Sequence, residues 1–460
     1  MINKLIFFTT VLLVMVFAGC KKSVFKTYAK PETTIFANDS RLTGKLIHFV
    51  KDTVYVLATN LNIYQGQVLQ IDPGTLIKVN DYLSVTINTG GRIEAKGTAT
   101  EPIVFTSSAY KGTPGFVSYS TSGGEHSWLG IVVHGNYPAP IDSSLQGTGV
   151  LSYVRIEFAG ASVSNFSGLG GLLLQNVGRG TVVENIQVSY CVRYNSFNIS
   201  GGNFNSRNLL SYASGGTDFN ITDGYRGMLQ NLLAYRHFYF APQAGSGTFL
   251  AGLQVTGDST FPAISNLTVL GPDLQPGTNP KYSDTTTAPG PIGNVNGSDV
   301  GALIVNSGQF RIRNTILMGF PKGGFILNNR NSAMSLQFGP SELTYSFLHS
   351  SDSGRTFHLR TGIYPPFTSG DMEEFLLRPL YANQWFLQST QFQFQDPYAY
   401  DTHPNPFPST GSPVLTGANF DGTIFADAFF NKVSYRGALG TDDWLKGWTN
   451  FLPLQTNYNN

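Results

Sequence analysis

The most constraining feature of this chain is a short internal repeat between residues 181 and 237. Three tyrosines that each follow a short apolar run recur at intervals of 22 and 23 residues: Tyr190, Tyr212 and Tyr235. Three asparagines that precede those runs recur every 23 residues: Asn185, Asn208 and Asn231. A period of this length is too long for a hairpin and contains no helix-length segment. It predicts one turn of a coil, a rung of short strands and turns that stacks on the next rung.

Elementary chemistry favours such a stack. Each rung would hydrogen-bond to its neighbours about 4.8 Å away, and like side chains would pile into an interior column. Asparagine tolerates left-handed backbone and can hydrogen-bond along the stack, so we expect it at the rung corners. A β-sandwich would instead show Asn-Gly or Asp-Gly turns about every 8–12 residues, and these are scarce. The predicted fold class is therefore all-β, a parallel β-helix or solenoid.

The composition sets limits on function. Charged residues make up 12% of the chain, the formal net charge is +1, and 41% of residues are hydrophobic. A chain of this kind can bury a core, which excludes a disordered protein. Since lysine and arginine are not in excess, nothing supports general nucleic-acid binding.

The N-terminus is typical of an exported protein. Lys4 precedes an apolar stretch from Leu5 to Phe17, which is too short to span a membrane but suits a signal peptide. The stretch ends in Phe17-Ala18-Gly19-Cys20, which resembles the lipobox of bacterial lipoproteins. We therefore expect residues 1–19 to be a signal peptide and Cys20 to carry a lipid that anchors the chain to the outer membrane, on its periplasmic or cell-surface side. The alternative is an ordinary signal peptide followed by a chance cysteine.

The second cysteine is predicted to be inert. Cys20 and Cys191 are the two cysteines of the chain, so acylation of Cys20 would leave Cys191 without a disulfide partner. Cys191 lies in a strand-like run with no motif that pairs it with a histidine, and we expect a buried thiol.

The remaining chain divides into three parts in our prediction. Residues 20–50 form the lipidated cysteine, a tether and an N-terminal cap, residues 51–440 form the β-helix with a long loop at 271–301, and residues 441–460 form a C-terminal cap. The cap is predicted as a short helix with an aromatic face that plugs the open coil end. The side chains of this plug would be Trp444, Leu445, Trp448 and Phe451, together with Phe429, Phe430 and Tyr435.

A series of motifs, specific in its order, carries a family resemblance. It includes Pro73-Gly74-Thr75, Gly97-Thr98-Ala99, Trp128-Leu129-Gly130-Ile131, Gly224-Tyr225-Arg226-Gly227, Arg313-Asn314-Thr315-Ile316 and Tyr435-Arg436-Gly437-Ala438. The series resembles the large right-handed parallel β-helix proteins, pectate-lyase-like in architecture, that occur as lipoproteins and secreted proteins of Bacteroidetes. The resemblance covers residues 54 to 454 and implies a right-handed parallel β-helix. Such architecture includes polysaccharide lyases, but a fold alone does not carry a function.

One departure from the family pattern bears on cofactors. The resemblance implies acidic clusters on the two rungs around Phe197 and Phe219, whereas here Asp218 and Asp223 are the carboxylates that remain. Calcium takes about six to eight oxygen ligands with several carboxylates. These rungs supply such ligands poorly, so we expect no cofactor, with calcium as the alternative, and we expect no other metal site.

Candidate catalytic groups lie on or near successive rungs. A polysaccharide lyase needs a base and a positive charge near the uronate, and a glycosidase needs two carboxylates about 5–10 Å apart. The candidates are Asp218, Asp223, Arg226, Arg236 and His237. The alternative is that the aspartates cap turns and the basic residues are solvated. The seven histidines show no metal-ligand spacing, although His349 and His358 could be neighbours on adjacent turns.

Candidate ligand-binding groups form a tyrosine-rich strip that could stack on sugar rings: Tyr190, Arg193, Tyr194, Tyr225 and Tyr239. The alternative is that these rings pack inside the coil. We predict a monomeric, membrane-anchored β-helix that binds an extended ligand, a polysaccharide, without catalysis. Two other functions stay open: a polysaccharide lyase or glycoside hydrolase, and a structural or adhesive surface protein without glycan affinity.

Overall fold

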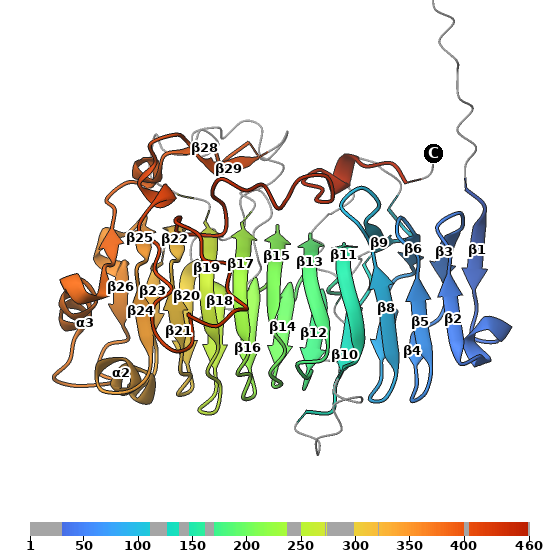
Figure 1. The fold of residues 1–460 in the computed structure, drawn as a ribbon, viewed down its shortest axis with the longest axis horizontal. Helices are drawn as coiled ribbons and strands as arrows, with labels where there is room; N and C mark the ends of the chain where they lie inside the picture. The colour runs from blue at the N-terminus through green and yellow to red at the C-terminus, as the bar shows by residue number, and fades with distance from the viewer. Residues whose placement is uncertain are drawn as a thin grey trace, which may run out of the picture.

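Parallel strands stacked rung upon rung make up most of the molecule (Figure 1). The computed structural model describes residues 30–110, 127–137, 147–161, 170–236, 250–271, 273, 299–320, 322–399 and 404–458. The predicted signal peptide, Cys20, His237, Tyr239 and most of the loop at 271–301 lie outside the described residues. The parallel β-helix predicted from the 22- to 23-residue period is confirmed.

Each rung contributes to three columns of strands. The first column holds β2 (Leu46–Phe49), β5 (Val68–Ile71), β8 (Arg92–Lys96), β21 (Arg311–Arg313) and β24 (Glu342–Thr344). The second column holds β1 (Glu32–Ile35), β3 (Val54–Leu57), β6 (Leu76–Val79), β9 (Ile103–Ser107), β22 (Ile316–Phe320), β25 (Phe347–Ser350) and β27 (Gln384–Trp385). Five long strands bend through both columns: β11 (Gly149–Glu157), β13 (Val182–Ser189), β15 (Ser206–Tyr212), β17 (Met228–Tyr235) and β19 (Ala263–Leu270).

These two columns form one sheet, called sheet A, and the third column forms sheet B. Sheet B consists of β4 (Leu61–Ile63), β7 (Ser84–Ile87), β10 (Gly130–His134), β12 (Leu172–Gln175), β14 (Phe197–Ser200), β16 (Phe219–Thr222), β18 (Leu250–Thr256), β20 (Asp299–Val305), β23 (Phe325–Leu327) and β26 (Phe357–Leu359). Parallel pairing thus runs from Glu32 to Trp385. The coil therefore begins before residue 51, its predicted start, and its last paired strand ends before residue 440, its predicted end.

Asparagines turn four of the five long strands at their corners, as predicted, and Tyr153, with a φ of 52°, takes this position in β11. Asn185, Asn208 and Asn231 have φ angles of 54°, 60° and 57°, the left-handed region that asparagine tolerates. Their side chains form a ladder: Asn208 Nδ2 donates to Asn185 Oδ1 at 2.9 Å, and Asn231 Nδ2 donates to Asn208 Oδ1 at 3.0 Å. The same corner continues at Asn266 and Asn314, with φ angles of 56° and 55°.

The coil interior is apolar and aligned in columns. Ile186, Leu209 and Leu232 are paired in register and fully buried. On sheet B, the rings of Phe197 and Phe219 stack with centroids 5.1 Å apart and an interplanar angle of 19°. Close-packed interiors of this kind lose several kcal/mol when a large side chain is removed.

The three repeating tyrosines also form a column of contacting rings, but on the outside of sheet A. The ring centroids of Tyr190 and Tyr212 are 5.7 Å apart, and those of Tyr212 and Tyr235 are 5.5 Å apart. The prediction that they pile into a column is confirmed, although the column faces outward from the coil core. Phe451 covers it, with its ring edge-on to Tyr212 at 5.1 Å.

The cover belongs to a C-terminal strap, residues 409–458. It follows a small antiparallel pair, β28 (Phe394–Asp396) and β29 (Asn405–Pro408), and runs back along the coil toward the N-terminal rungs as the red chain of Figure 1. Near its end, Tyr458 packs against Val54, Leu76 and Val104.

Side-chain amides of the coil hold the strap. Gln187 Nε2 donates to the carbonyl of Asn450 at 2.6 Å, and Asn450 N–H donates back to Gln187 Oε1 at 2.8 Å. Gln230 pairs in the same two-bond way with Asn431, at 2.7 and 2.8 Å. Asn314 does so with the backbone of Asn419, at 2.9 and 2.8 Å. Each coil amide therefore satisfies both backbone groups of one strap residue.

The predicted aromatic capping helix is wrong. Residues 441–451 form turns, and Gly447 has a φ of 88°, which ends any helical run there. Leu445 and Phe451 pack on the outward tyrosine column, and Phe430 packs on Met228 and Ala263. The aromatic residues thus cover the flank, because sheet A presents an apolar outer face there.

Helices instead close the C-terminal end of the coil (Figure 1). In α3 (Ser369–Leu376), Met372 and Leu376 are fully buried in the coil core beyond the last rung, next to β26. The part of the chain that the structure describes has one other α-helix, α2 (Arg330–Gln337), and short 3-10 turns at Ser40–Thr43, Ser353–Arg355, Pro379–Tyr381, Ser389–Phe392, Pro413–Leu415 and Pro453–Gln455. Among the described residues, neither α-helix has the length and apolarity needed to cross a membrane.

Candidate functional site

The outer face of sheet B carries rows of amides and hydroxyls. The strand sequences Phe-Asn-Ile at 197–199 and 219–221 alternate inward and outward, so Asn198 and Asn220 point away from the core. Asn220 Nδ2 donates to Asn198 Oδ1 at 3.1 Å, and Gln254 Nε2 donates to Asn220 Oδ1 at 3.1 Å. We call Asn198, Asn220 and Gln254 the amide row; all three are half-buried.

A second polar row runs beside the amide row. Gln175, Ser200 and Thr222 are paired in register at the ends of β12, β14 and β16. His134 continues this row on β10, where its Nδ1 is 2.8 Å from Gln175 Oε1. In the sequence, Asn198 and Asn220 are 22 residues apart, as are Ser200 and Thr222. We predicted a tyrosine strip and missed the amides, because amides inside a repeat also suit turns.

Asp218 and Arg236 meet, but away from solvent. Arg236 Nε lies 2.9 Å from Asp218 Oδ2, and both side chains are at most 2% exposed. Arg236 also donates to the carbonyls of Ser214 and Ala251, and Asp218 Oδ1 accepts a hydrogen bond from Ser211. A buried, hydrogen-bonded ion pair fixes the corner between the sheets, and it offers no acid or base to a polymer outside the coil.

Asp223 and Arg226 are exposed but do not join that pair. Asp223 follows β16 and Asp218 precedes it, so the strand separates the two by roughly 16 Å. Asp223 Oδ2 accepts from Ser200 Oγ at 2.7 Å, and Arg226 Nε donates to the carbonyl of Ser259 at 2.9 Å. The predicted carboxylate pair of a glycosidase is therefore wrong for these residues, since a glycosidase pair lies about 5–10 Å apart.

The predicted aromatic binding strip is largely interior. Tyr190 is 4% exposed under the strap, and Tyr225 is fully buried in the coil core, where its hydroxyl donates to the carbonyl of Phe204 at 2.7 Å. Neither ring can stack on a sugar. Arg193 is exposed and Tyr194 is half-buried in the turn before β14, so these two candidates remain at the edge of sheet B.

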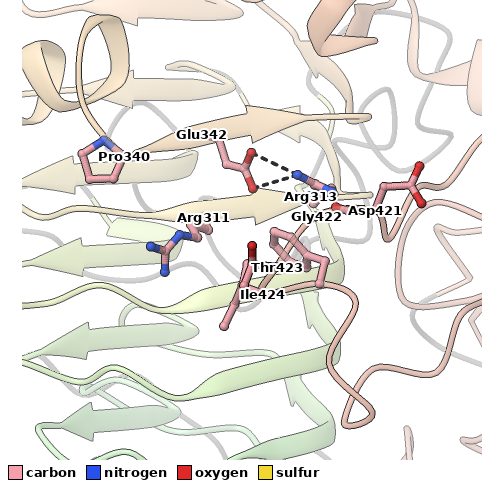
Figure 2. A pocket seen from close by; sticks show the side chains of 9 residues that line it. Arg311, Arg313, Pro340, Glu342, Asp421, Gly422, Thr423 and Ile424 are labelled. Atoms are coloured by element: carbon pink, nitrogen blue, oxygen red, sulfur yellow. Dashed lines mark hydrogen bonds and ion pairs between the residues drawn. The ribbon is translucent and has the colours of Figure 1, made fainter.

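A separate pocket opens on the flank of sheet A (Figure 2). It has a volume of about 460 Å³ and lies between β21, β24 and the strap. Its lining residues are Arg311, Arg313, Pro340, Glu342, Asp421, Gly422, Thr423, Ile424 and Phe425. Arg313 Nη2 bonds both carboxylate oxygens of Glu342 at 3.1 Å, drawn as dashed lines in Figure 2.

Sequence comparison bears on these sites. A family model described as a pectate-lyase like beta helix domain matches residues 42–346. The chain belongs to this family. Searches of curated proteins and of solved structures give no match. Membership in the pectate-lyase-like β-helix family is compatible with glycan binding or with a polysaccharide lyase.

The histidines that the structure describes in this pectate-lyase-like chain do not form a metal centre. His349 lies on β25 of sheet A and His358 on β26 of sheet B, so the prediction that they are neighbours on adjacent turns is wrong. Burial lowers the pKa of His349, whose Nδ1 accepts from the Gly319 N–H at 3.1 Å. Within the described ranges, no group of three or more histidine, cysteine, aspartate or glutamate side chains is placed to hold a metal ion.

Cys191 is structural. It is fully buried, and its Sγ donates to the carbonyl of Tyr194 at 3.1 Å. Burial raises the pKa of the thiol to about 12, so at neutral pH it is protonated and a poor nucleophile. The predicted inert thiol is confirmed.

Proposed function

We propose that this pectate-lyase-like chain is a glycan-binding protein of the cell envelope that holds an extended polysaccharide on the outer face of sheet B. The observation that carries the proposal is the amide row, repeated at the spacing of the rungs beside the row of Gln175, Ser200 and Thr222. A side-chain amide both donates and accepts hydrogen bonds, which matches the hydroxyl groups of a sugar.

The repeat suits an extended ligand. Neighbouring rungs lie about 4.8 Å apart, so equivalent polar groups recur along the coil and can engage successive parts of one polymer. Arg193 and Tyr194 lie in the turn before β14, at the edge of this face. An aromatic ring at an edge can stack on a sugar ring, so we assign Tyr194 as a contributing contact.

The binding is non-catalytic in this proposal. Asp218 and Arg236, two of the five catalytic candidates from the sequence, form an ion pair that is buried in the coil corner. Cleavage of a uronate polymer with release of unsaturated ends would overturn this part of the proposal and establish a lyase.

A glycan panel tests the binding face. We expect the triple variant Asn198→Ala, Asn220→Ala, Gln254→Ala to lose affinity by at least about tenfold, since each lost hydrogen bond contributes about 0.5–1.5 kcal/mol. Tyr194→Ala should weaken binding less. The control is Gln70→Ala, which removes a half-buried amide from β5 on sheet A. Equal affinity in the triple variant and the wild type would refute the proposed face, and no glycan binding at all would favour a structural or adhesive protein.

The envelope location rests on the N-terminal sequence. We propose that Cys20 carries the lipid that anchors the chain to the outer membrane, as in a lipoprotein. Metabolic labelling with a fatty acid should label the wild type and not Cys20→Ala, and the variant should leave the membrane fraction. Membrane retention and labelling of Cys20→Ala would refute the anchor.

A further inference from the structure

Two arginines on one short strand differ in their partners. Arg311 and Arg313 lie on β21, on either side of Ile312, whose side chain points into the coil core. Because side chains alternate along a strand, both arginines face outward to the flank pocket. Figure 2 shows the Arg311 guanidinium pointing away from the Arg313–Glu342 pair.

All five N–H groups of Arg313 are used. Its Nε donates to Thr344 Oγ1, its Nη1 donates to Asn419 Oδ1 and to the carbonyl of Asp421, and its Nη2 donates to both oxygens of Glu342. Arg313 therefore fastens the strap to the coil and has no donor left for a ligand.

The Arg311 side chain has no such partners. Among the residues that the structure describes, its guanidinium makes no hydrogen bond or ion pair, and the guanidinium carbon lies 3.7 Å from the centroid of the Phe261 ring. The ring covers one face of the guanidinium and leaves the N–H groups at its edge for another molecule.

The electrostatic setting favours an anion at that edge. Partial burial lowers the pKa of Arg311. The Glu342 carboxylate raises this pKa, whereas the nearby Arg226 guanidinium lowers it further. Since Glu342 already bonds Arg313 with both oxygens, it does not neutralise Arg311. A half-desolvated cation without a hydrogen-bonded counter-ion gains energy when an anion replaces the lost water.

The pocket has enough volume, and enough apolar lining, for the uncharged part of a small anionic ligand. Its volume of about 460 Å³ lies within the range of small-molecule sites, about 300–1,000 Å³. Pro340 and Ile424 supply apolar surface, and Ile424 belongs to the strap. The site therefore exists only while the strap is docked.

We propose that Arg311 is the anion-binding residue of a pocket that takes a carboxylate group, and that the strap forms the pocket's outer wall. A carboxylate is planar and accepts two parallel N–H bonds from the edge of a guanidinium, which is the geometry that Arg311 leaves open. The site lies on sheet A, apart from the amide row, so it does not depend on the proposed glycan face.

Titration calorimetry on the full chain tests this site with matched probes. The sugar arm compares glucuronate with glucose, and the peptide arm compares an N-acetylated dipeptide acid with its C-terminal amide. We expect a carboxylate probe to bind and its neutral partner not to bind. Binding of glucuronate alone identifies a sugar acid as the source, and binding of the peptide acid alone identifies a peptide terminus. Absence of binding in both arms, or equal binding of inorganic phosphate, overturns the proposal.

Variants locate the site. Arg311→Gln should weaken carboxylate binding by about 10- to 100-fold, the loss expected for hydrogen bonds to a charged group. Arg311→Lys keeps the charge but loses the planar fork, so it should weaken binding less while leaving the unfolding midpoint unchanged. The control Arg360→Gln removes an exposed arginine that bonds Asn328 outside the pocket.

Hydrogen exchange of the strap is a second test of the site. Bound carboxylate should slow hydrogen exchange of residues 421–425 in the wild type and not in Arg311→Gln, because the ligand lies between the strap and β21. Wild-type affinity in either folded Arg311 variant, or protection of the strap that persists in Arg311→Gln, would overturn the assignment.

Discussion

The coil and the C-terminal strap are stabilised in different ways. Each rung of the coil pairs its backbone with the rungs beside it and stacks like side chains in the interior, as Phe197 and Phe219 do. The strap has little backbone pairing of its own and is held by side chains of the coil, with Gln187, Gln230 and Asn314 each binding one strap residue. Stability in the coil comes from a repeat, whereas stability in the strap comes from individual side chains.

This difference predicts how far the structural effect of a substitution extends. A defect in the coil core affects the neighbouring rungs, because all of them share one continuous interior. A defect in a strap contact should open the strap and leave the coil folded, because local opening takes less free energy than global unfolding. The following variants test that separation, from the largest expected effect to the smallest.

Phe219→Ala should have the largest effect. It removes a fully buried ring that stacks on Phe197, and such truncations cost about 3–5 kcal/mol. The free energy of unfolding, measured in denaturant, should fall by this amount. Phe338→Ala serves as the control, since that ring is 75% exposed and its loss should cost less than about 0.5 kcal/mol.

Asn208→Ala should cost about 2–4 kcal/mol, because it removes two ladder hydrogen bonds and places an alanine at a φ of 60°. Asn208→Gly removes the same bonds but tolerates the backbone, so it should be more stable than the alanine variant by about 1 kcal/mol. Equal stabilities in denaturant would show that the corner geometry contributes nothing.

Gln230→Ala tests the strap, although it also removes one coil hydrogen bond, from Gln230 Nε2 to Asn266 Oδ1 at 3.2 Å. It leaves the N–H and carbonyl groups of Asn431 without their partners, a local loss of about 1–3 kcal/mol. Hydrogen exchange near residue 431 should accelerate about tenfold or more, while exchange in β14 and β16 stays at the wild-type rate. Faster exchange in both places would contradict the separation of coil and strap.

The smallest expected effect is a dependence on pH at His349. Burial lowers its pKa in the folded state below the ordinary 6.5, although the neighbouring Asp273 carboxylate opposes the shift. The unfolded chain therefore binds a proton at a higher pH than the folded chain, so stability is present above pH 6.5 and declines as the pH falls below it. His349→Gln should reduce the drop in the unfolding free energy between pH 7.5 and pH 5. An identical drop in this variant would exclude His349 as its source.

The repeat made the coil predictable from sequence, while the strap was not. Asn185, Asn208 and Asn231 recur at a fixed interval and report a corner directly. Trp444, Leu445, Trp448 and Phe451 have helical spacing, but their partners lie elsewhere in the chain, and packing on the tyrosine column overrode the local pattern.

The candidate sites divide in the same way. Their places on successive rungs made Asp218 and Arg236 catalytic candidates, and the two side chains do meet. Both are buried, however, and sequence spacing does not reveal burial. The pocket at Arg311 could not be predicted, because it joins β21 to strap residues more than 100 positions away.

The asparagine corners also suggest how such a chain can change its length. Corner asparagines are 23 residues apart from Asn185 to Asn231, then 35 residues apart to Asn266 and 48 to Asn314, yet all keep the left-handed turn. The additional residues fall between β17 and β18 and between β19 and β20, so the connections from sheet A to sheet B accept insertions without a shift in strand register. Duplication or deletion of one whole rung, from one corner to the next, should therefore preserve the fold. The coil can be lengthened or shortened one rung at a time.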